Sequence, residues 1–176
     1  MVYAIAIFPK GCAQLEKIRE IYDHRQKNIP AHITLVFPFP DSAMTKTEFV
    51  KHATKICNKS NSFNITTSTT TISWDNAVLL RVNRGKDNVI ALHDALYSGP
   101  LRKHLAKINY LPHITLGIFS NKKGAQTMRK KYPAVKTESL VEETVLLKVN
   151  TSEKFITTSG PKIVWSRKIK LSESSL

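Results

Sequence analysis

The tetrapeptide His-Ile-Thr-Leu occurs twice in this sequence, beginning once at His32 and again at His113. Each copy follows a proline inside an apolar run, a pattern typical of a β-strand. Alternate side chains of a strand share a face, so His32 and Thr34 point to the same side. His113 and Thr115 do the same in the second copy. The repeat therefore predicts one site in which two imidazoles and two hydroxyls face each other.

Two histidines in one site can supply paired acid–base catalysis. Histidine titrates near neutral pH, so one copy can accept a proton while the other donates one. A neutral imidazole would deprotonate a nucleophile, and an imidazolium would protonate a leaving oxygen, which suits in-line attack at phosphorus. The hydroxyls of Thr34 and Thr115 could hold the non-bridging phosphate oxygens and stabilise the charge that develops on them.

Other chemistries have weaker support in the sequence. A single buried histidine is commonly a structural residue, but a matched second copy in the same strand context argues against that reading. Two histidines supply only half of a tetrahedral zinc shell, and no cysteine cluster or carboxylate-rich segment completes it. The chain also lacks a Gly-x-Ser-x-Gly elbow and a Gly-x-x-x-x-Gly-Lys-Ser/Thr phosphate loop. We therefore expect neither a metal nor another cofactor.

The elements that must position the two motifs follow from the apolar pattern. Thr45 and Glu48 match a capping box at the start of a helix. Helical stripes are predicted in the segments 15–22, 45–56, 87–96 and 124–132. The threonine-rich segment 65–72 is predicted to be a solvated edge strand. The faces of the motif strands that point away from the histidines carry Ile33, Leu35 and Phe37 in the first copy and Ile114, Leu116 and Ile118 in the second.

A second internal repeat links Val78–Asn83 to Val145–Asn150, with only Arg81 exchanged for Lys148. Each half of the chain then shows the same order of helix, histidine strand, helix and Val-Leu-Leu strand. This order predicts a mixed α+β fold of two lobes about a pseudo-twofold axis, with residues 1–176 forming a single bilobal domain. Because they occupy matching places, Arg81 and Lys148 are candidate phosphate contacts, although a basic residue on a solvated strand face is more common.

The charge of the chain points to an anionic partner. The 176 residues carry a formal net charge of +14, and the pI is about 9.9. Basic proteins of this size often bind polyanions, because each neutralised phosphate releases counterions. Two basic clusters stand out: Lys122, Lys123, Arg129, Lys130 and Lys131 after the second motif, and Lys162, Arg167, Lys168 and Lys170 near the C-terminus.

The sequence also bears on location and assembly. No apolar stretch approaches the roughly 18 residues that span a bilayer, and the N-terminal apolar segment lacks a basic leader. Cys12 and Cys57 have no metal-type spacing, and two cysteines do not make a disulfide framework. We expect a cytoplasmic protein with no membrane contact, and a monomer.

Paired His-x-Thr-Leu motifs, one in each half of a chain of this length, resemble those of the two-histidine (2H) phosphoesterase superfamily. Within it the chain is most similar to the bacterial 2′-5′ RNA ligase-like proteins. The resemblance covers nearly the whole chain, from the strand at 3–8 to the strands after Val145. It implies a bilobal fold of antiparallel sheets with flanking helices and a central cleft, no required metal, and cleavage of cyclic or 2′-5′ phosphodiesters.

The resemblance also assigns roles and substrates. It puts His32 and His113 at the catalytic positions of the family, and Thr34 and Thr115 at the phosphate-binding positions. The implied substrates are RNA ends or nucleotides that carry 2′,3′-cyclic or 2′-5′ phosphodiesters. Some relatives also join RNA through a 2′-5′ bond without ATP, by the reverse reaction.

Two questions remain open from the sequence. Base stacking needs an aromatic ring, and Tyr110 and Trp74 are candidate platforms, although Trp74 could equally pack beneath the threonine-rich strand. The function itself has two alternatives to hydrolysis: ATP-independent 2′-5′ ligation, or a basic RNA-binding module that keeps the fold without turnover. Steeply salt-dependent RNA affinity with no product would identify the binding module.

Overall fold

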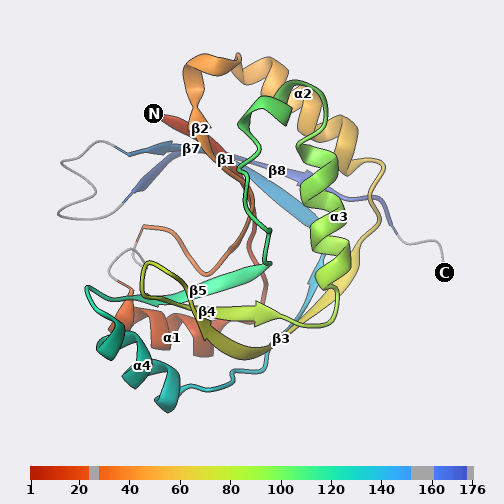
Figure 1. Cartoon of the computed structure of the whole chain (residues 1–176). Coiled ribbons are helices and arrows are strands. Elements are labelled where there is room, and N and C mark those ends of the chain that lie inside the picture. Colours follow the sequence, from red (N-terminus) through yellow and green to blue (C-terminus); the bar gives the residue numbers. More distant parts are fainter. Residues whose placement is uncertain (24–27, 152–160, 174–176) are drawn as a thin grey trace.

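The computed structural model describes residues 1–23, 28–151 and 161–173 (Figure 1). Its helices and strands follow in the order β1 (Val2–Ile7), α1 (Ala13–Tyr22), β2 (Ile33–Pro40), α2 (Lys46–Cys57), β3 (Phe63–Ile72), β4 (Ala77–Val82), α3 (Lys86–Leu96), β5 (His113–Ile118), α4 (Lys122–Lys131), β6 (Glu138–Val141), β7 (Glu143–Asn150) and β8 (Lys162–Lys170). Short 3-10 helices lie at Asp41–Ala43 and Gly99–His104. None of the described helices combines the length and apolar character needed to cross a membrane.

The strands form two four-stranded antiparallel sheets. The first sheet has the order β2-β1-β7-β8, and the second has the order β5-β4-β3-β6. In each sheet the strand with a His-Ile-Thr-Leu motif lies at one edge, and β2 and β5 contact each other. The predicted α+β fold with antiparallel sheets and flanking helices is confirmed.

Two of the connecting helices pack against the sheet to which they do not belong in sequence. Helix α1 joins β1 to β2 in the first sheet but packs against β5 of the second. Helix α3 joins β4 to β5 in the second sheet but packs against β2 of the first. Figure 1 shows α1 beside α4 on one side of the molecule and α3 beside α2 on the other. Each motif strand is therefore supported by a helix that belongs to the opposite sheet.

A shared core holds the sheets together. One apolar cluster contains buried residues of both, for example Ile5 and Ile33 from the first and Leu80 and Ile114 from the second. Packing is tight at Gly117, where an added Cβ would lie 2.7 Å from Cβ of Tyr22 and 2.9 Å from Sδ of Met128. The missing side chain lets α1 and α4 approach β5 closely.

Local signals in the sequence account for the helices. The Thr45 capping box is confirmed, because its side chain accepts from the backbone N–H of Glu48 while Glu48 accepts from the Thr45 N–H. The predicted stripe of α3 is also confirmed, with Val89, Leu92 and Leu96 all buried.

The repeat of Val-Leu-Leu strands is not a structural equivalence. β4 lies next to the motif strand β5, whereas the strand next to β2 is β1, and β7 lies one position further away. The strand equivalent to β4 is therefore β1, and β7 corresponds to β3. Both β4 and β7 are interior strands, and most of the residues in each are buried, which accounts for their similar apolar runs. The predicted equivalence of Arg81 and Lys148 is wrong.

The threonine-rich strand is not an edge strand either. β3 lies between β4 and β6, and Thr67 and Thr70 are buried. The Thr67 hydroxyl donates to the carbonyl oxygen of Val135 at 2.8 Å, and the Thr70 hydroxyl donates to that of Tyr132 at 2.8 Å. Partners from a distant segment thus make polar side chains compatible with an interior position.

Candidate active site

A β-bulge interrupts β2 within its motif. Ala6 of β1 pairs with Thr34, and the next residue, Ile5, pairs with Val36, so Leu35 is an extra residue in the ladder. An extra residue shifts the alternation of side chains by one. As a result Leu35 and Val36 are both fully buried, although they are neighbours in a strand.

The second motif contains the same bulge at the same place. Leu79 of β4 pairs with Thr115, and Val78 pairs with Gly117, which leaves Leu116 as the extra residue. Leu116 and Gly117 are again both buried. The two motifs therefore share a backbone irregularity as well as a sequence, and within the motifs the pseudo-twofold relation holds residue by residue.

The bulges correct the predicted faces of the two strands. Strict alternation put Phe37 and Ile118 on the core side, opposite the histidines. With one residue inserted, both side chains return to the side of the threonines: Phe37 lines a cavity with Thr34, and Ile118 lines one with Thr115. The site therefore has an aromatic ring in its wall that the sequence pattern assigned to the core.

Side chains from outside the sheet bond the backbone groups around the first bulge. His93 of α3 bonds the Leu35 carbonyl through Nδ1 at 2.7 Å. The Tyr110 hydroxyl donates to the Thr34 carbonyl at 2.7 Å, and the Tyr97 hydroxyl accepts from the Phe37 N–H at 2.8 Å. These bonds satisfy polar groups that a bulge takes out of the ladder.

Tyr110 is thus not a base-stacking platform. Its ring lies on the His93 ring, with centroids 3.7 Å apart and planes within 3° of parallel. Burial raises the pKa of the Tyr110 hydroxyl far above its ordinary value, so this group stays a neutral donor. The residue bonds the backbone at Thr34, one face of its ring is covered by His93, and it lines neither of the cavities that contain His113.

Both motif histidines are tied to their own backbone in the same way. Nδ1 of His32 lies 2.8 Å from the carbonyl oxygen of Pro30, and Nδ1 of His113 lies 2.6 Å from that of Leu111. A carbonyl oxygen can only accept, so Nδ1 carries the proton in each neutral ring. Nε2 is then the nitrogen of each imidazole that can exchange a proton with a ligand.

The four motif side chains line one cavity of about 310 Å³ between the sheets, here called the central cavity. Its wall includes His32, Thr34, His113 and Thr115, and Phe37 lies beside them. The first sheet contributes an apolar floor of Ala4, Ala6, Leu147 and Val149. The structure thus brings together the two histidines and two threonines that the sequence singled out. Across the described ranges, no three His, Cys, Asp or Glu side chains gather as metal ligands would.

The environment of His113 favours a neutral imidazole. Burial lowers the pKa of His113 below its ordinary value, while the bond to the Leu111 carbonyl and the charge of Asp75 act in the opposite direction. Because of this lowered pKa, Nε2 of His113 stays unprotonated, and so able to accept a proton, at lower pH than in an ordinary histidine.

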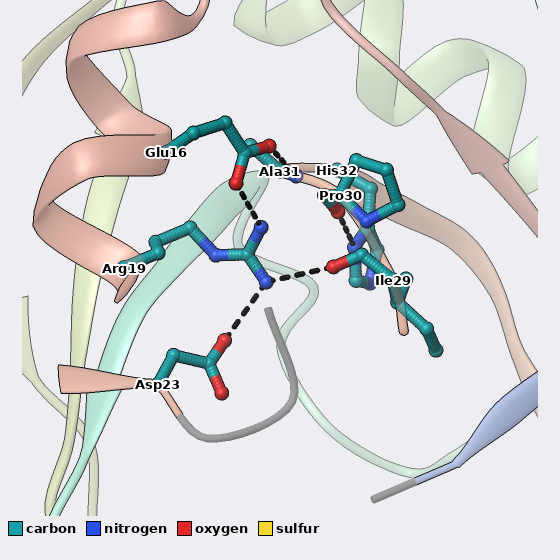
Figure 2. Close-up of polar contacts among 7 residues, drawn as sticks. All are labelled: Glu16, Arg19, Asp23, Ile29, Pro30, Ala31 and His32. Carbon is teal, nitrogen blue, oxygen red and sulfur yellow. Dashed lines mark hydrogen bonds and ion pairs between the residues drawn. The ribbon is translucent and has the colours of Figure 1, made fainter. Parts of the chain in front are cut away.

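A buried ionic network from α1 holds the segment that leads into His32 (Figure 2). Arg19 is 2% exposed, and its guanidinium donates to Asp23 at 2.8 Å and to the Ile29 carbonyl at 3.0 Å. It also donates to Glu16 at 3.1 Å, and the other oxygen of Glu16 accepts from the Ala31 N–H at 2.5 Å. The network thus bonds the backbone at Ile29 and at Ala31, on either side of Pro30. The Pro30 carbonyl in turn orients His32.

Sequence reasoning did not identify Arg19 or Glu16. A signal was available, because Arg19 follows Leu15 by four residues and precedes Tyr22 by three and so falls on the apolar stripe of α1. Acidic residues three positions before it and four after it are spaced for ion pairs on the same helix face. A charged residue on a buried face with two such neighbours indicates an internal ion network.

The other predicted contacts have different positions. Arg81 is exposed and is the register partner of His113, so it shares the face of the second sheet that carries the site. In the first sheet Phe8 and His32 lie one residue beyond the Ile7–Ile33 pair, and their ring centroids are 5.7 Å apart. Lys148 points away from the central cavity, because its neighbours Leu147 and Val149 line it, and it pairs with Asp41 at 2.8 Å.

Trp74 and the first basic cluster complete the set of predicted residues. Trp74 is 95% exposed, so it does not pack beneath β3. The cluster of basic residues at 122–131 lies on α4, which packs against β3 and β4 and approaches Gly117 of β5 through Met128. It does not border the central cavity.

Comparison with known proteins gives the family. A sequence model described as the 2′-5′ RNA ligase superfamily matches residues 7–153. A protein from Geobacillus thermodenitrificans that is provisionally named a phosphoesterase is 31% identical over 121 residues, which cover 66% of this chain and 69% of that protein.

Solved structures show the same fold. LigT of E. coli in complex with 3′-AMP superimposes with a TM-score of 0.65 at 16% identity, covering 98% of both chains. TT0787 of Thermus thermophilus gives a TM-score of 0.67 at 16% identity, covering 99% of this chain and 100% of that one. With the family model matching most of its length, this chain belongs to the 2′-5′ RNA ligase superfamily of phosphoesterases.

Proposed function

We propose that this protein is a phosphodiesterase that hydrolyses 2′,3′-cyclic or 2′-5′ phosphodiesters at nucleotide or RNA ends, with His32 and His113 as its acid and base. The observation that carries the proposal is the matched pair of imidazoles in the central cavity, each bound through Nδ1 to a backbone carbonyl. With Nδ1 bound to a carbonyl, Nε2 is the nitrogen through which each ring would exchange a proton with one bound group.

The proposed reaction opens a 2′,3′-cyclic phosphate. Neutral His113, whose pKa is lowered by burial, accepts a proton from water through Nε2 while the water oxygen bonds to phosphorus. The bond from phosphorus to O3′ breaks, and protonated His32 donates its Nε2 proton to that oxygen. The products are a 2′-phosphate and a free 3′-hydroxyl, and proton exchange with solvent restores both rings.

Three groups are proposed to hold the phosphate. The hydroxyls of Thr34 and Thr115 lie in the same cavity as the imidazoles and can donate to the non-bridging oxygens. Arg81, opposite His113 in the sheet, can approach the phosphate from the second lobe. Preformed donors of this kind stabilise the charge that develops in the transition state.

The relatives agree with nucleotide chemistry. LigT of E. coli has been crystallised with 3′-AMP, with ATP and with NADP+. Ligation through a 2′-5′ bond is the reverse of the proposed cleavage and would use the same two histidines, so the family name favours it as the second candidate. We place the activity in the cytoplasm, where RNA is available and the free thiols of Cys12 and Cys57 stay reduced.

The first prediction concerns the four motif residues. His32→Ala and His113→Ala should each reduce turnover of a nucleoside 2′,3′-cyclic phosphate by about 10²- to 10⁴-fold, the usual contribution of general acid–base catalysis. Thr34→Ala and Thr115→Ala should cost about 10- to 1000-fold, at or below the loss of an oxyanion donor. The assay contains EDTA, and His52→Ala on α2 is the control. Wild-type turnover in both single histidine variants would refute the assignment.

The second prediction concerns the network behind His32. Glu16→Ala removes the acceptor of the Ala31 N–H and one partner of Arg19, so His32 should lose its fixed position. We expect kcat to fall by about 10-fold with KM little changed, since catalysis depends on alignment. Glu16→Gln should recover most of kcat, because its amide oxygen can still accept from Ala31.

Glu20→Ala, an exposed substitution on the same helix, is the matched control for this prediction. Unfolding midpoints measured in parallel separate positioning from loss of folded protein. Equal kcat values for Glu16→Ala and Glu20→Ala would contradict the role of the network.

The third prediction concerns pH. The Asp75 carboxylate favours the charged form of His113, so Asp75→Asn should lower the pKa of His113 further. If His113 is the base, the acidic limb of the bell-shaped profile of kcat/KM should move to lower pH. Asp87→Asn, at an exposed position on α3, should leave the limb in place. An unmoved limb in Asp75→Asn, with the His113 resonance titrating at a lower pH in NMR, would exclude His113 as the base.

A further inference from the structure

A second cavity adjoins the central one on the side of His113. It has a volume of about 410 Å³ and shares Phe37, His113 and Thr115 with the central cavity. Its remaining wall comes from two segments: the β3–β4 turn with Trp74 and Asp75, and the chain before β5 with Ile108 and Asn109. We call it the side cavity. A group attached to a phosphate in the central cavity can extend into it.

The aromatic ring in this wall is unusual for the protein. Trp74 is 95% exposed, and every other aromatic side chain in the described part of the chain is at least partly buried. Ile108 in the same wall is 62% exposed. Large apolar side chains exposed together beside a cavity are typical of a ligand site.

The turn that carries Trp74 is held by a dense set of hydrogen bonds. Ser73 N–H donates to the Ala77 carbonyl at 2.9 Å, and Ala77 N–H donates to the Ser73 hydroxyl oxygen at 2.9 Å. The Ser73 hydroxyl also lies within hydrogen-bond distance of the Asp75 carboxylate. Asn76 closes the turn at a φ of 62°, a conformation that asparagine tolerates well. The indole and the carboxylate therefore project from an ordered turn, which lowers the entropic cost of binding.

The charges of the side cavity disfavour a second phosphate. Apart from His113, Asp75 is the only ionisable side chain among the described residues that line it, and these include no lysine or arginine. A carboxylate repels anions and accepts hydrogen bonds from N–H donors. The occupant that fits is an uncharged flat ring with N–H groups on its edge, which stacks on the indole and bonds to Asp75 and Asn109.

We infer that the side cavity is a nucleobase subsite, in which Trp74 stacks on the base attached to the reacting phosphate and Asp75 selects bases that carry an amino group. This inference rests on the proposed function, because it takes the phosphate to lie between the two histidines. It narrows the substrate to nucleotides with adenine, cytosine or guanine at this position in preference to uracil, because the one edge N–H of uracil lies between two carbonyl oxygens that a carboxylate repels. Asn109 supplies the second polar contact to the edge of the base.

Fluorescence tests the subsite without turnover. The chain has two tryptophans, and Trp165 lies on β8 beneath the Lys46 ammonium, outside both cavities. Trp165→Phe therefore leaves Trp74 as the only indole reporter. Titration of this variant with adenosine 2′-monophosphate should quench its emission, uridine 2′-monophosphate should bind several-fold more weakly, and inorganic phosphate should not quench.

Substitutions at the subsite sharpen the test. Trp74→Ala should weaken binding of adenosine 2′-monophosphate, measured by calorimetry, by about 5- to 150-fold, the range that corresponds to loss of one base stack. Trp74→Phe should retain most of the affinity, and Asp75→Asn should reduce the preference for adenosine over uridine.

The outcomes separate the two proposals. Quenching by the nucleotide without hydrolysis of any cyclic substrate would contradict the proposed function and support the subsite. Hydrolysis of nucleoside cyclic phosphates with unchanged KM in Trp74→Ala, or a lack of quenching at saturating nucleotide, would overturn the subsite and leave the proposed function standing.

Discussion

Both imidazoles of the central cavity are bound at Nδ1 to a carbonyl oxygen two residues earlier in the chain. That single constraint sets the tautomer of each neutral ring, with the proton on Nδ1, and orients the ring against its own backbone. In the proposed function Nε2 is then the nitrogen that exchanges protons. The carbonyls belong to Pro30 and to Leu111, next to Pro112, so proline stiffens the chain at both places. The remaining features of the site act by holding these two short segments and the bulges that follow them.

Helices α1 and α3 hold these segments, and each of them connects strands of one sheet while it packs against the motif strand of the other. From α1 comes the Arg19 and Glu16 network that grips the segment before His32, while the same helix packs on β5. His93 of α3 and Tyr97, the residue directly after it, bond the backbone around the first bulge, while that helix connects strands of the second sheet. Each sheet thus depends on a helix of the other for the geometry of its motif strand. A change in the packing between the sheets would reach both histidines.

The sequence predicts that the four motif side chains converge. In each copy the histidine and the threonine are two residues apart in a strand and therefore share one face. The faces of Phe37 and Ile118 could not, since a bulge at Leu35 or Leu116 leaves the apolar pattern unchanged and alters only the register. The Val-Leu-Leu repeat wrongly predicted that β4 and β7 are equivalent strands. Their sequences are alike because both are interior strands of their sheets. The burial of Thr67 depends on the Val135 carbonyl, a partner brought in by tertiary packing that no local pattern contains. Arg19 differs, because its acidic partners lie three residues before it and four after it on the same helix face.

In the proposed function, both Nε2 atoms exchange protons with groups bonded to one phosphorus atom. Two-dimensional NMR of the protein with 15N-labelled histidine tests it most directly. His32 and His113, in their neutral forms, should both carry the proton on Nδ1. A nucleoside 2′-monophosphate should shift both Nε2 resonances along one saturation curve with a single Kd. An Nε2-protonated tautomer in either ring, or a response from only one histidine at saturation, would contradict a phosphate site shared by the two rings.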